Sequence, residues 1–129
     1  MKICIFVCDD SLAWKPKDFG DMFIDTLMSH LRILSCEGGD SKYEFHKCFC
    51  AAGESVSQYL DADIFIISGS RFNVRDGVAG KLEWFDPICH LIRQVAEDPH
   101  STKRIIGCCF GHQLIAYALG GKVDKNPIN

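Results

Sequence analysis

The sequence has 129 residues, a formal net charge of −3 at neutral pH and eight cysteines. A chain of this length predicts one domain, residues 1–129, with a single core. Acidic and basic residues are interspersed, without the basic stripe that a phosphate backbone requires, so we expect no nucleic-acid partner. No apolar run approaches the roughly 20 residues that span a bilayer, so we expect no membrane partner either.

The cysteine content raises the alternative of a disulfide-stapled secreted domain. That class is short and loop-rich, whereas this chain is rich in Ile, Leu and Phe. The N-terminal ICIFVC is too short for a secretory signal and runs into Asp9 and Asp10. We therefore expect reduced thiols and a cytoplasmic location.

The first half of the chain alternates between strand and helix patterns. Lys2 to Cys8 is a nearly continuous apolar run, typical of a strand covered on both faces. Residues 18–34 place apolar side chains at helical spacing on one side, which predicts an amphipathic helix. The period-2 pattern of Tyr43 to Cys50 predicts a second strand near an edge, and a short helix is expected over residues 54–60.

The second half continues this alternation. Ile64 to Ile67 is a third apolar strand, ended by the turn residues Ser68 to Ser70. A helical pattern runs from Lys81 to Val95, but Pro87 interrupts it, so we expect a helix that restarts with Asp86 as N-cap.

A fourth short buried strand is predicted over residues 105–108, and a helix over residues 112–119. Solidly apolar strands that alternate with helices predict an α/β fold, a doubly wound, mainly parallel sheet with helices on both faces. Ligands bind such sheets outside the carboxyl ends of the strands.

The turn between the last strand and helix reads Gly107-Cys108-Cys109-Phe110-Gly111, a G-x-C-x-G counterpart of the G-x-S-x-G nucleophile elbow. The two glycines lie where strand and helix approach, and this frame selects Cys109 as the nucleophile. Cys108 is expected to end the strand and point into the protein as an inert thiol. The same core interpretation applies to Cys4, Cys8, Cys36 and Cys89.

The position of Cys109 also predicts its chemistry. The following helix directs its N-terminal amides at the sulfur and favours the nucleophilic thiolate. Such a turn supplies one oxyanion donor from the amide after the nucleophile, here Phe110, and a second from a neighbouring strand end, for which Gly69 is best placed. His112 lies on the same short turn and is not expected to act as a base.

A metal site is the competing use of the thiols. His46, Cys48 and Cys50 form an H-x-C-x-C, but on an extended strand the outer two lie about 13 Å apart and cannot hold one ion. We expect no metal and no cofactor.

The run Gly107 to Gln113 resembles the G-x-C-x-G-H-Q motif of class I glutamine amidotransferases. Ile66 to Ser70 corresponds to the oxyanion-strand turn of that family, and Gly120 to Val123 and Asn126-Pro127 correspond to its sequence after the elbow helix. The N-terminal part, with Cys8-Asp9-Asp10 and Phe19 to Phe23, is similar to stand-alone members related to the amidotransferase domain of GMP synthase and to γ-glutamyl peptidases.

This resemblance implies a flavodoxin-like fold and a cysteine hydrolase or transferase. Cys109 would attack the γ-amide of glutamine or a γ-glutamyl bond to give a thioester, with Gly69 and Phe110 as oxyanion donors and Gln113 as a substrate contact. The sequence leaves open which of the two substrates is used.

The family's catalytic histidine and glutamate lie in an H-x-E motif well after the elbow, and the chain ends at Asn129 without it. The resemblance therefore implies the N-terminal portion of a single domain, incomplete at its C-terminus, with very weak activity alone. A missing C-terminal segment or a synthase is the expected partner. We also expect an exposed apolar edge beside the fourth strand and self-association through it.

Two alternatives remain open at this point: a non-catalytic doubly wound binding module, and a thiol sensor of the DJ-1-like kind. The His112-Gln113 pair favours the amidotransferase interpretation over the sensor, because a sensor has no need to bind a glutamyl group.

Overall fold

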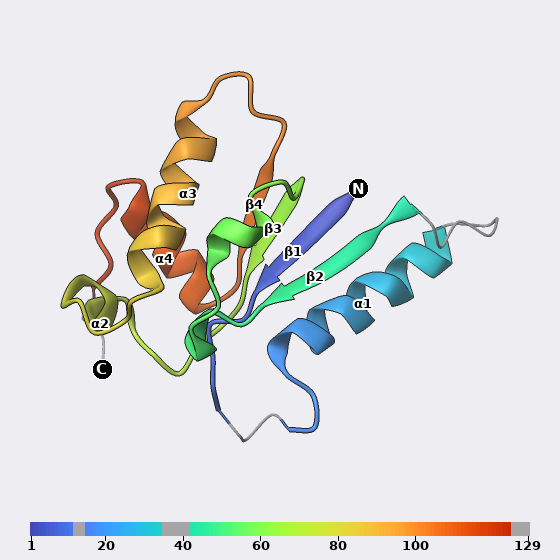
Figure 1. Ribbon diagram of the computed structural model, residues 1–129, viewed down its shortest axis with the longest axis horizontal. Coiled ribbons are helices and arrows are strands. Elements are labelled where there is room, and N and C mark those ends of the chain that lie inside the picture. The colour runs from blue at the N-terminus through green and yellow to red at the C-terminus, as the bar shows by residue number, and fades with distance from the viewer. Residues whose placement is uncertain (12–14, 35–41, 125–129) are drawn as a thin grey trace.

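The computed structural model describes residues 1–11, 15–34 and 42–124. Four strands form one parallel sheet in the order β2-β1-β3-β4 (Figure 1). In chain order they are β1 (Lys2–Phe6), β2 (Glu44–Cys48), β3 (Ile64–Ile67) and β4 (Arg104–Gly107). The predicted α/β class with a parallel sheet is therefore confirmed.

One face of the sheet is covered by helix α1 (Phe19–Leu34), which begins one residue later than predicted. Alternate residues of β1 point to this face, and Ile3 and Ile5 form a cluster in which Phe23 and Leu27 of α1 pack. The helical spacing of these α1 residues thus gives the contact that the sequence predicts.

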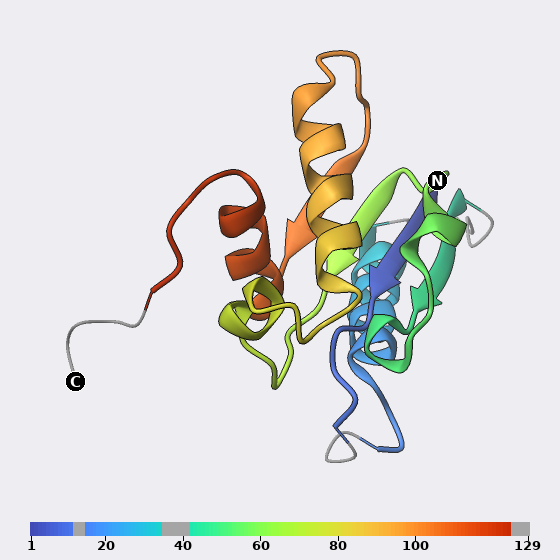
Figure 2. The ribbon, with the colours of Figure 1, turned by 60° about the vertical axis from the view of Figure 1, so that its left-hand side comes forward.

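The opposite face carries the larger core, beneath helices α3 (Phe85–Glu97) and α4 (Phe110–Ala118). Figure 2 shows these two helices on the side of the sheet away from α1. Phe6 and Phe65 stack from adjacent strands with ring centroids 5.6 Å apart, and Phe85 of α3 is fully buried in the same core. Helices on both faces make the sheet doubly wound.

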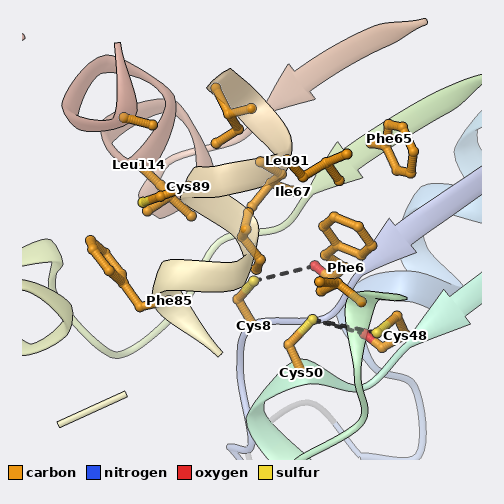
Figure 3. Close-up of a cluster of buried hydrophobic side chains, with 14 of the residues drawn as sticks. Phe6, Cys8, Cys48, Cys50, Phe65, Ile67, Phe85, Cys89, Leu91 and Leu114 are labelled. Carbon is orange, nitrogen blue, oxygen red and sulfur yellow. Dashed lines mark hydrogen bonds between the residues drawn. The ribbon is translucent and has the colours of Figure 1, made fainter. Parts of the chain in front are cut away.

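The second strand ends earlier than predicted. The distances that an extended strand would give from Cys50 to His46 and Cys48 are therefore wrong. β2 stops at Cys48, and Cys50 begins a short 3₁₀ helix, η3 (Cys50–Ala52). The chain bends here because Ala51 N donates to the carbonyl of Val7, just past β1. Cys48 Sγ and Cys50 Sγ therefore lie 3.6 Å apart in the core, beside Cys8 (Figure 3). Within the described residues, no three His, Cys, Asp or Glu side chains are grouped to hold a metal ion.

Helix α3 shows how Pro87 is accommodated. The helix starts at Phe85 with Trp84 at the N-cap, so the predicted N-cap at Asp86 is wrong. Pro87 is the third helical residue, where a backbone amide would have no helical acceptor in any case. The predicted short helix near residue 54 is the 3₁₀ helix η4 (Val56–Tyr59).

A helix that the sequence analysis did not predict, α2 (Val74–Val78), follows β3. Asn73 caps it in a reciprocal capping box with Asp76. Gly77 lets the ring of Phe85 approach, because a Cβ at Gly77 would lie 2.0 Å from that ring. The close contact fixes α2 against α3.

The fourth strand lies at the edge of the sheet, so the expectation of a buried strand is wrong. Arg104 is exposed and Ile106 retains 53% of its accessible surface. The predicted exposed apolar edge is present at Ile106, while self-association through it stays a prediction. In the part of the chain that the structure describes, none of the helices has the length and apolar character of a membrane span.

The contact between α2 and α3 gives a stability prediction. Gly77→Ala should lower the free energy of unfolding by about 1–3 kcal/mol, because the added methyl group overpacks against the Phe85 ring. Urea denaturation measures the change. In the double variant with Phe85→Leu, the added cost of Gly77→Ala should shrink; an unchanged cost would show that the ring is not the obstacle.

Candidate functional site

Three polar segments meet at the carboxyl edge of the sheet. They follow β1 (residues 9–11), β3 (residues 68–70, the serine turn) and β4 (residues 107–111, the cysteine turn). Parallel strands bring these segments to one edge, where ligands of such sheets bind. Hydrogen bonds between Cys8 and the serine turn join the ends of β1 and β3, and the Gly111 amide bonds the cysteine turn to the Ser68 carbonyl.

Cys109 has an unusual backbone conformation at the centre of the cysteine turn. It is the N-cap of α4, with φ 51° and ψ −105°. Among the described residues it is the one non-glycine residue with positive φ. Such a conformation is strained and persists when the surrounding structure enforces it. The turn holds the Cys109 side chain in solvent rather than in the core, since the residue is exposed.

The two glycines of the cysteine turn allow strand and helix to touch. A Cβ on Gly107 would lie 2.4 Å from the backbone of Gly111, and a Cβ on Gly111 would lie 2.3 Å from the carbonyl oxygen of Ile67. The Gly111 amide donates to the carbonyls of Ser68 and Cys108, at 3.2 and 2.9 Å. No side chain fits at either position, as the G-x-C-x-G frame predicts.

The serine turn is clamped to the chain that follows β1. Buried Ser68 Oγ accepts from the Cys8 amide at 2.9 Å, and Ser70 Oγ donates to the Cys8 carbonyl at 2.5 Å. Both backbone polar groups of Cys8 are therefore satisfied by serines, and Gly69 is fixed between them. The ideal Cβ position of Gly69 lies 3.7 Å from Cys109 Cβ, so the serine turn flanks the predicted nucleophile.

Asp9 and Asp10, whose role the sequence left open, hold the segment after the serine turn. Asp9 accepts from the Arg71 amide at 2.6 Å, and Asp10 accepts from the Arg71 guanidinium at 2.6 and 3.1 Å. Hydrogen bonding to Arg71 lowers the pKa of Asp10, so the carboxylate stays charged near neutrality. Asp9 thus holds the backbone of Arg71, and Asp10 holds its side chain.

The two predicted oxyanion donors, the backbone amides of Gly69 and Phe110, belong to residues that neighbour Cys109 in space and in sequence. Phe110 is the first residue of α4, where amides lack helical acceptors. Within the described chain, neither amide has a hydrogen-bond acceptor. The side chain of Phe110 is buried against Trp84, with ring centroids 5.6 Å apart, which anchors the start of the helix.

Cys109 opens onto a cavity of about 360 Å³, the thiol cavity. Gln113, one turn along α4, lines it, and the Gln113 amide donates to the Cys109 carbonyl at 3.1 Å. The opposite wall comes from α2 and from the end of the described chain, with Arg75 and Asp124. The predicted substrate contact and the predicted nucleophile thus share one cavity.

The charged residues of the thiol cavity were not predicted from the sequence. Arg75 lies on the unpredicted helix α2, and Asp124 follows the Gly120-Gly121 turn. Neither has a motif that signals a binding role. His112 is exposed on α4, and no histidine lines the cavity among the described residues.

Cys108 is exposed, so the prediction that it lies in the core is wrong. It follows the edge strand β4, which has no further strand beside it among the described residues. The core prediction holds for Cys4, Cys8 and Cys89, which are buried. Cys36 and the Asn126-Pro127 pair lie outside the described residues.

Comparison with known proteins agrees with this arrangement. The family model "Glutamine amidotransferase class-I" matches residues 16–129. The chain therefore belongs to the class I glutamine amidotransferase family. The Saccharomyces cerevisiae protein named "Putative glutamine amidotransferase YLR126C" is 31% identical over 131 residues, which cover 98% of this chain and 50% of that protein.

Two Arabidopsis thaliana proteins match a shorter part. Gamma-glutamyl peptidase 4 is 39% identical over 61 residues, and gamma-glutamyl peptidase 3 is 33% identical over 63 residues. These alignments cover 47% and 49% of this chain and 22% of each relative. The chain spans about half the length of the yeast relative. No solved structure matches significantly.

The cysteine turn gives a prediction about glycine. Gly111→Ala should lower the free energy of unfolding by about 1–3 kcal/mol or more, because the methyl group meets a backbone carbonyl that cannot rotate away. Gly69→Ala is the matched control, since its Cβ meets atoms no closer than 3.6 Å. Thermal unfolding compares the two, and equal stability of both variants would contradict the close approach.

Exposure of the cysteines predicts an alkylation pattern. Iodoacetamide at neutral pH should modify Cys108 and Cys109 in the native protein but spare Cys4 and Cys89. Burial raises the pKa of Cys4 to about 12 and that of Cys89 to about 11, so neither forms the reactive thiolate. Peptide mass spectrometry reads out each site, with urea-unfolded protein as control. Native labelling of Cys89 as fast as that of Cys108 would contradict the packing of α3.

Proposed function

We propose that this chain carries the acylation site of an enzyme that acts on the γ-amide of glutamine or on a γ-glutamyl bond, through a thioester on Cys109. One observation carries the proposal: Cys109 is held at positive φ on the N-cap of α4, beside Gly69 and open to the thiol cavity. Membership of the class I glutamine amidotransferase family and similarity to γ-glutamyl peptidases support this reaction class.

In the proposed reaction, the Cys109 thiolate attacks the γ-carbonyl carbon, and the carbonyl electron pair moves onto oxygen. The N-terminal amides of α4 favour the thiolate before attack. The amides of Gly69 and Phe110 donate to the oxyanion, which forms only in the transition state and intermediate. The turn acts as a nucleophile elbow with its oxyanion hole.

Collapse of this intermediate breaks the C–N bond and releases ammonia or an amine, which takes up a proton. Water then attacks the γ-glutamyl thioester, and the products are glutamate and the free thiol. Both proton transfers call for a general acid and base. Because no histidine lines the thiol cavity in the described part of the chain, we propose that the base comes from a further segment or a partner.

Turnover by the chain alone should therefore be very slow, because expulsion of ammonia or an amine also needs the general acid, whereas a substrate with a weakly basic leaving group can still acylate Cys109. A synthase that receives the ammonia is a proposed partner for glutamine as substrate, and none is needed for a γ-glutamyl peptide. A second candidate is a non-catalytic binding module of the same fold, which would need no histidine, and none lines the cavity among the residues that the structure describes.

Trapping the thioester tests the proposal. The chain is incubated with γ-glutamyl-p-nitroanilide, quenched in acid and mapped by peptide mass spectrometry. We expect one γ-glutamyl adduct on Cys109, with release of p-nitroaniline in amounts that do not greatly exceed the protein, because hydrolysis of the thioester lacks its base.

Two variants control this experiment. Cys109→Ala should abolish the adduct, while Cys108→Ser, which removes the exposed neighbouring thiol, should leave it. An adduct that moves to Cys108, or none on the folded wild-type chain, would rule out acylation at Cys109 and favour the binding module.

A further inference from the structure

Two opposite charges lie on the wall of the thiol cavity and are not explained by the proposed chemistry at Cys109. The Arg75 guanidinium donates to Asp124 Oδ1 at 2.6 Å, and both residues line the cavity. About half of each side chain stays exposed, at 55% and 52%. Both side chains therefore remain partly accessible on the cavity wall that they form.

The fold places both residues with some precision. Arg75 sits on α2, whose start is fixed by the Asn73 capping box and whose packing is fixed by Gly77 against Phe85. The Asn73 side chain also accepts from the Arg75 amide at 2.8 Å. Arg75 is thus held by backbone contacts, which place its guanidinium on the cavity wall beside Asp124.

Asp124 reaches the cavity because the chain reverses after α4. Gly120 has φ 87°, and the Gly121 amide donates to the Ala116 carbonyl at 2.8 Å, which ends the helix. Val123 then packs against the core and lines the same cavity, so Asp124 is directed to Arg75.

We infer that Arg75 and Asp124 bind the amino-acid end of the substrate, Arg75 through the α-carboxylate and Asp124 through the α-ammonium group. This inference rests on the proposed function, because it presumes that the γ-carbonyl lies at Cys109. The two residues would make this site specific for substrates in which both α-groups are free and charged.

The chemistry of the two side chains matches a zwitterion. A guanidinium presents a planar fork that binds a carboxylate through two parallel hydrogen bonds. A carboxylate accepts several hydrogen bonds, so Asp124 can bind an ammonium group while it keeps its contact with Arg75. Lys122 Nζ also lies 3.2 Å from Asp124 Oδ2, but Lys122 is 85% exposed and is not part of the cavity wall.

The exposure of the pair favours its use in binding. An ion pair in contact with water adds little to stability, so the ligand charges can enter beside it at small cost. The Arg75–Asp124 pair has no net charge, so it repels neither a zwitterionic ligand nor the uncharged side chain of that ligand. A single arginine would instead attract any anion. Free glutamine and small γ-glutamyl compounds satisfy this requirement, and a glutamine within a polypeptide does not.

Protection of Cys109 from alkylation tests the inference without turnover. The rate of Cys109 modification by iodoacetamide is measured against increasing L-glutamine, N-acetyl-L-glutamine, which lacks the ammonium charge, and L-glutamine α-amide, which lacks the carboxylate. We expect L-glutamine to protect at concentrations about tenfold or more below either analogue, the effect of losing one charged hydrogen-bonding group.

Two variants test which residue binds the α-carboxylate of the ligand and which binds its α-ammonium group. Arg75→Met should raise the half-protecting concentration of L-glutamine about tenfold and remove the preference over the α-amide. Asp124→Asn should remove the preference over N-acetyl-L-glutamine. Circular dichroism and thermal unfolding of both variants show that the fold is intact, and protection is expressed relative to each variant's own alkylation rate without ligand. Arg104→Met is the matched control, because among the described residues the side chain of this exposed arginine bonds to the carbonyls of Thr102 and Lys103, its sequence neighbours, and it does not line the thiol cavity.

The outcomes separate this inference from the function on which it rests. A γ-glutamyl adduct on Cys109 together with equal protection by all three compounds, or unchanged protection in Arg75→Met, would overturn the charge-pair assignment and leave the proposed function standing. No protection by any compound and no adduct on the folded chain would overturn both.

Discussion

The arrangement of the site depends on one close approach, that of the first turn of α4 to the ends of β3 and β4. Gly111 touches the Ile67 carbonyl, and its amide bonds to the carbonyls of both Ser68 and Cys108. These contacts leave Cys109 no room for an ordinary backbone conformation, so its positive φ is imposed by its surroundings. Packing on either side of Cys109 offsets the energetic cost of this backbone conformation.

The serine turn shows how hydrogen bonding extends this constraint across the sheet. Ser68 and Ser70 bond to both polar groups of Cys8, which ties the end of β3 to the end of β1. Gly69 is left beside Cys109 with its amide unpaired within the described chain. Small hydroxyl residues around a glycine therefore have a structural purpose here: they fix a backbone donor without covering it.

Sequence patterns predicted the parts of this molecule in which local chemistry and tertiary packing agree. The strand from Ile64 to Ile67 and the two glycines around Cys109 follow from apolar runs and steric necessity. Cys108 was misplaced because its burial depends on what lies beside an edge strand, which no local pattern reveals. The extended spacing through Cys50 failed for a similar reason, since a bond from Ala51 to Val7 ends the strand.

The charged residues of the thiol cavity show a further limit of prediction from the sequence. They also show that different parts of the site have separate roles. Arg75 and Asp124 are 49 positions apart and meet only because α2 packs on α3 and the chain reverses after α4. By our proposal, the described chain thus brings together a nucleophile, two backbone oxyanion donors and the recognition of the substrate's charged end. All of these act before or during acylation. By the same proposal, the group still required is a general acid and base, which protonates the leaving amine and activates the water that hydrolyses the thioester, so substrate binding is separable in this chain from turnover.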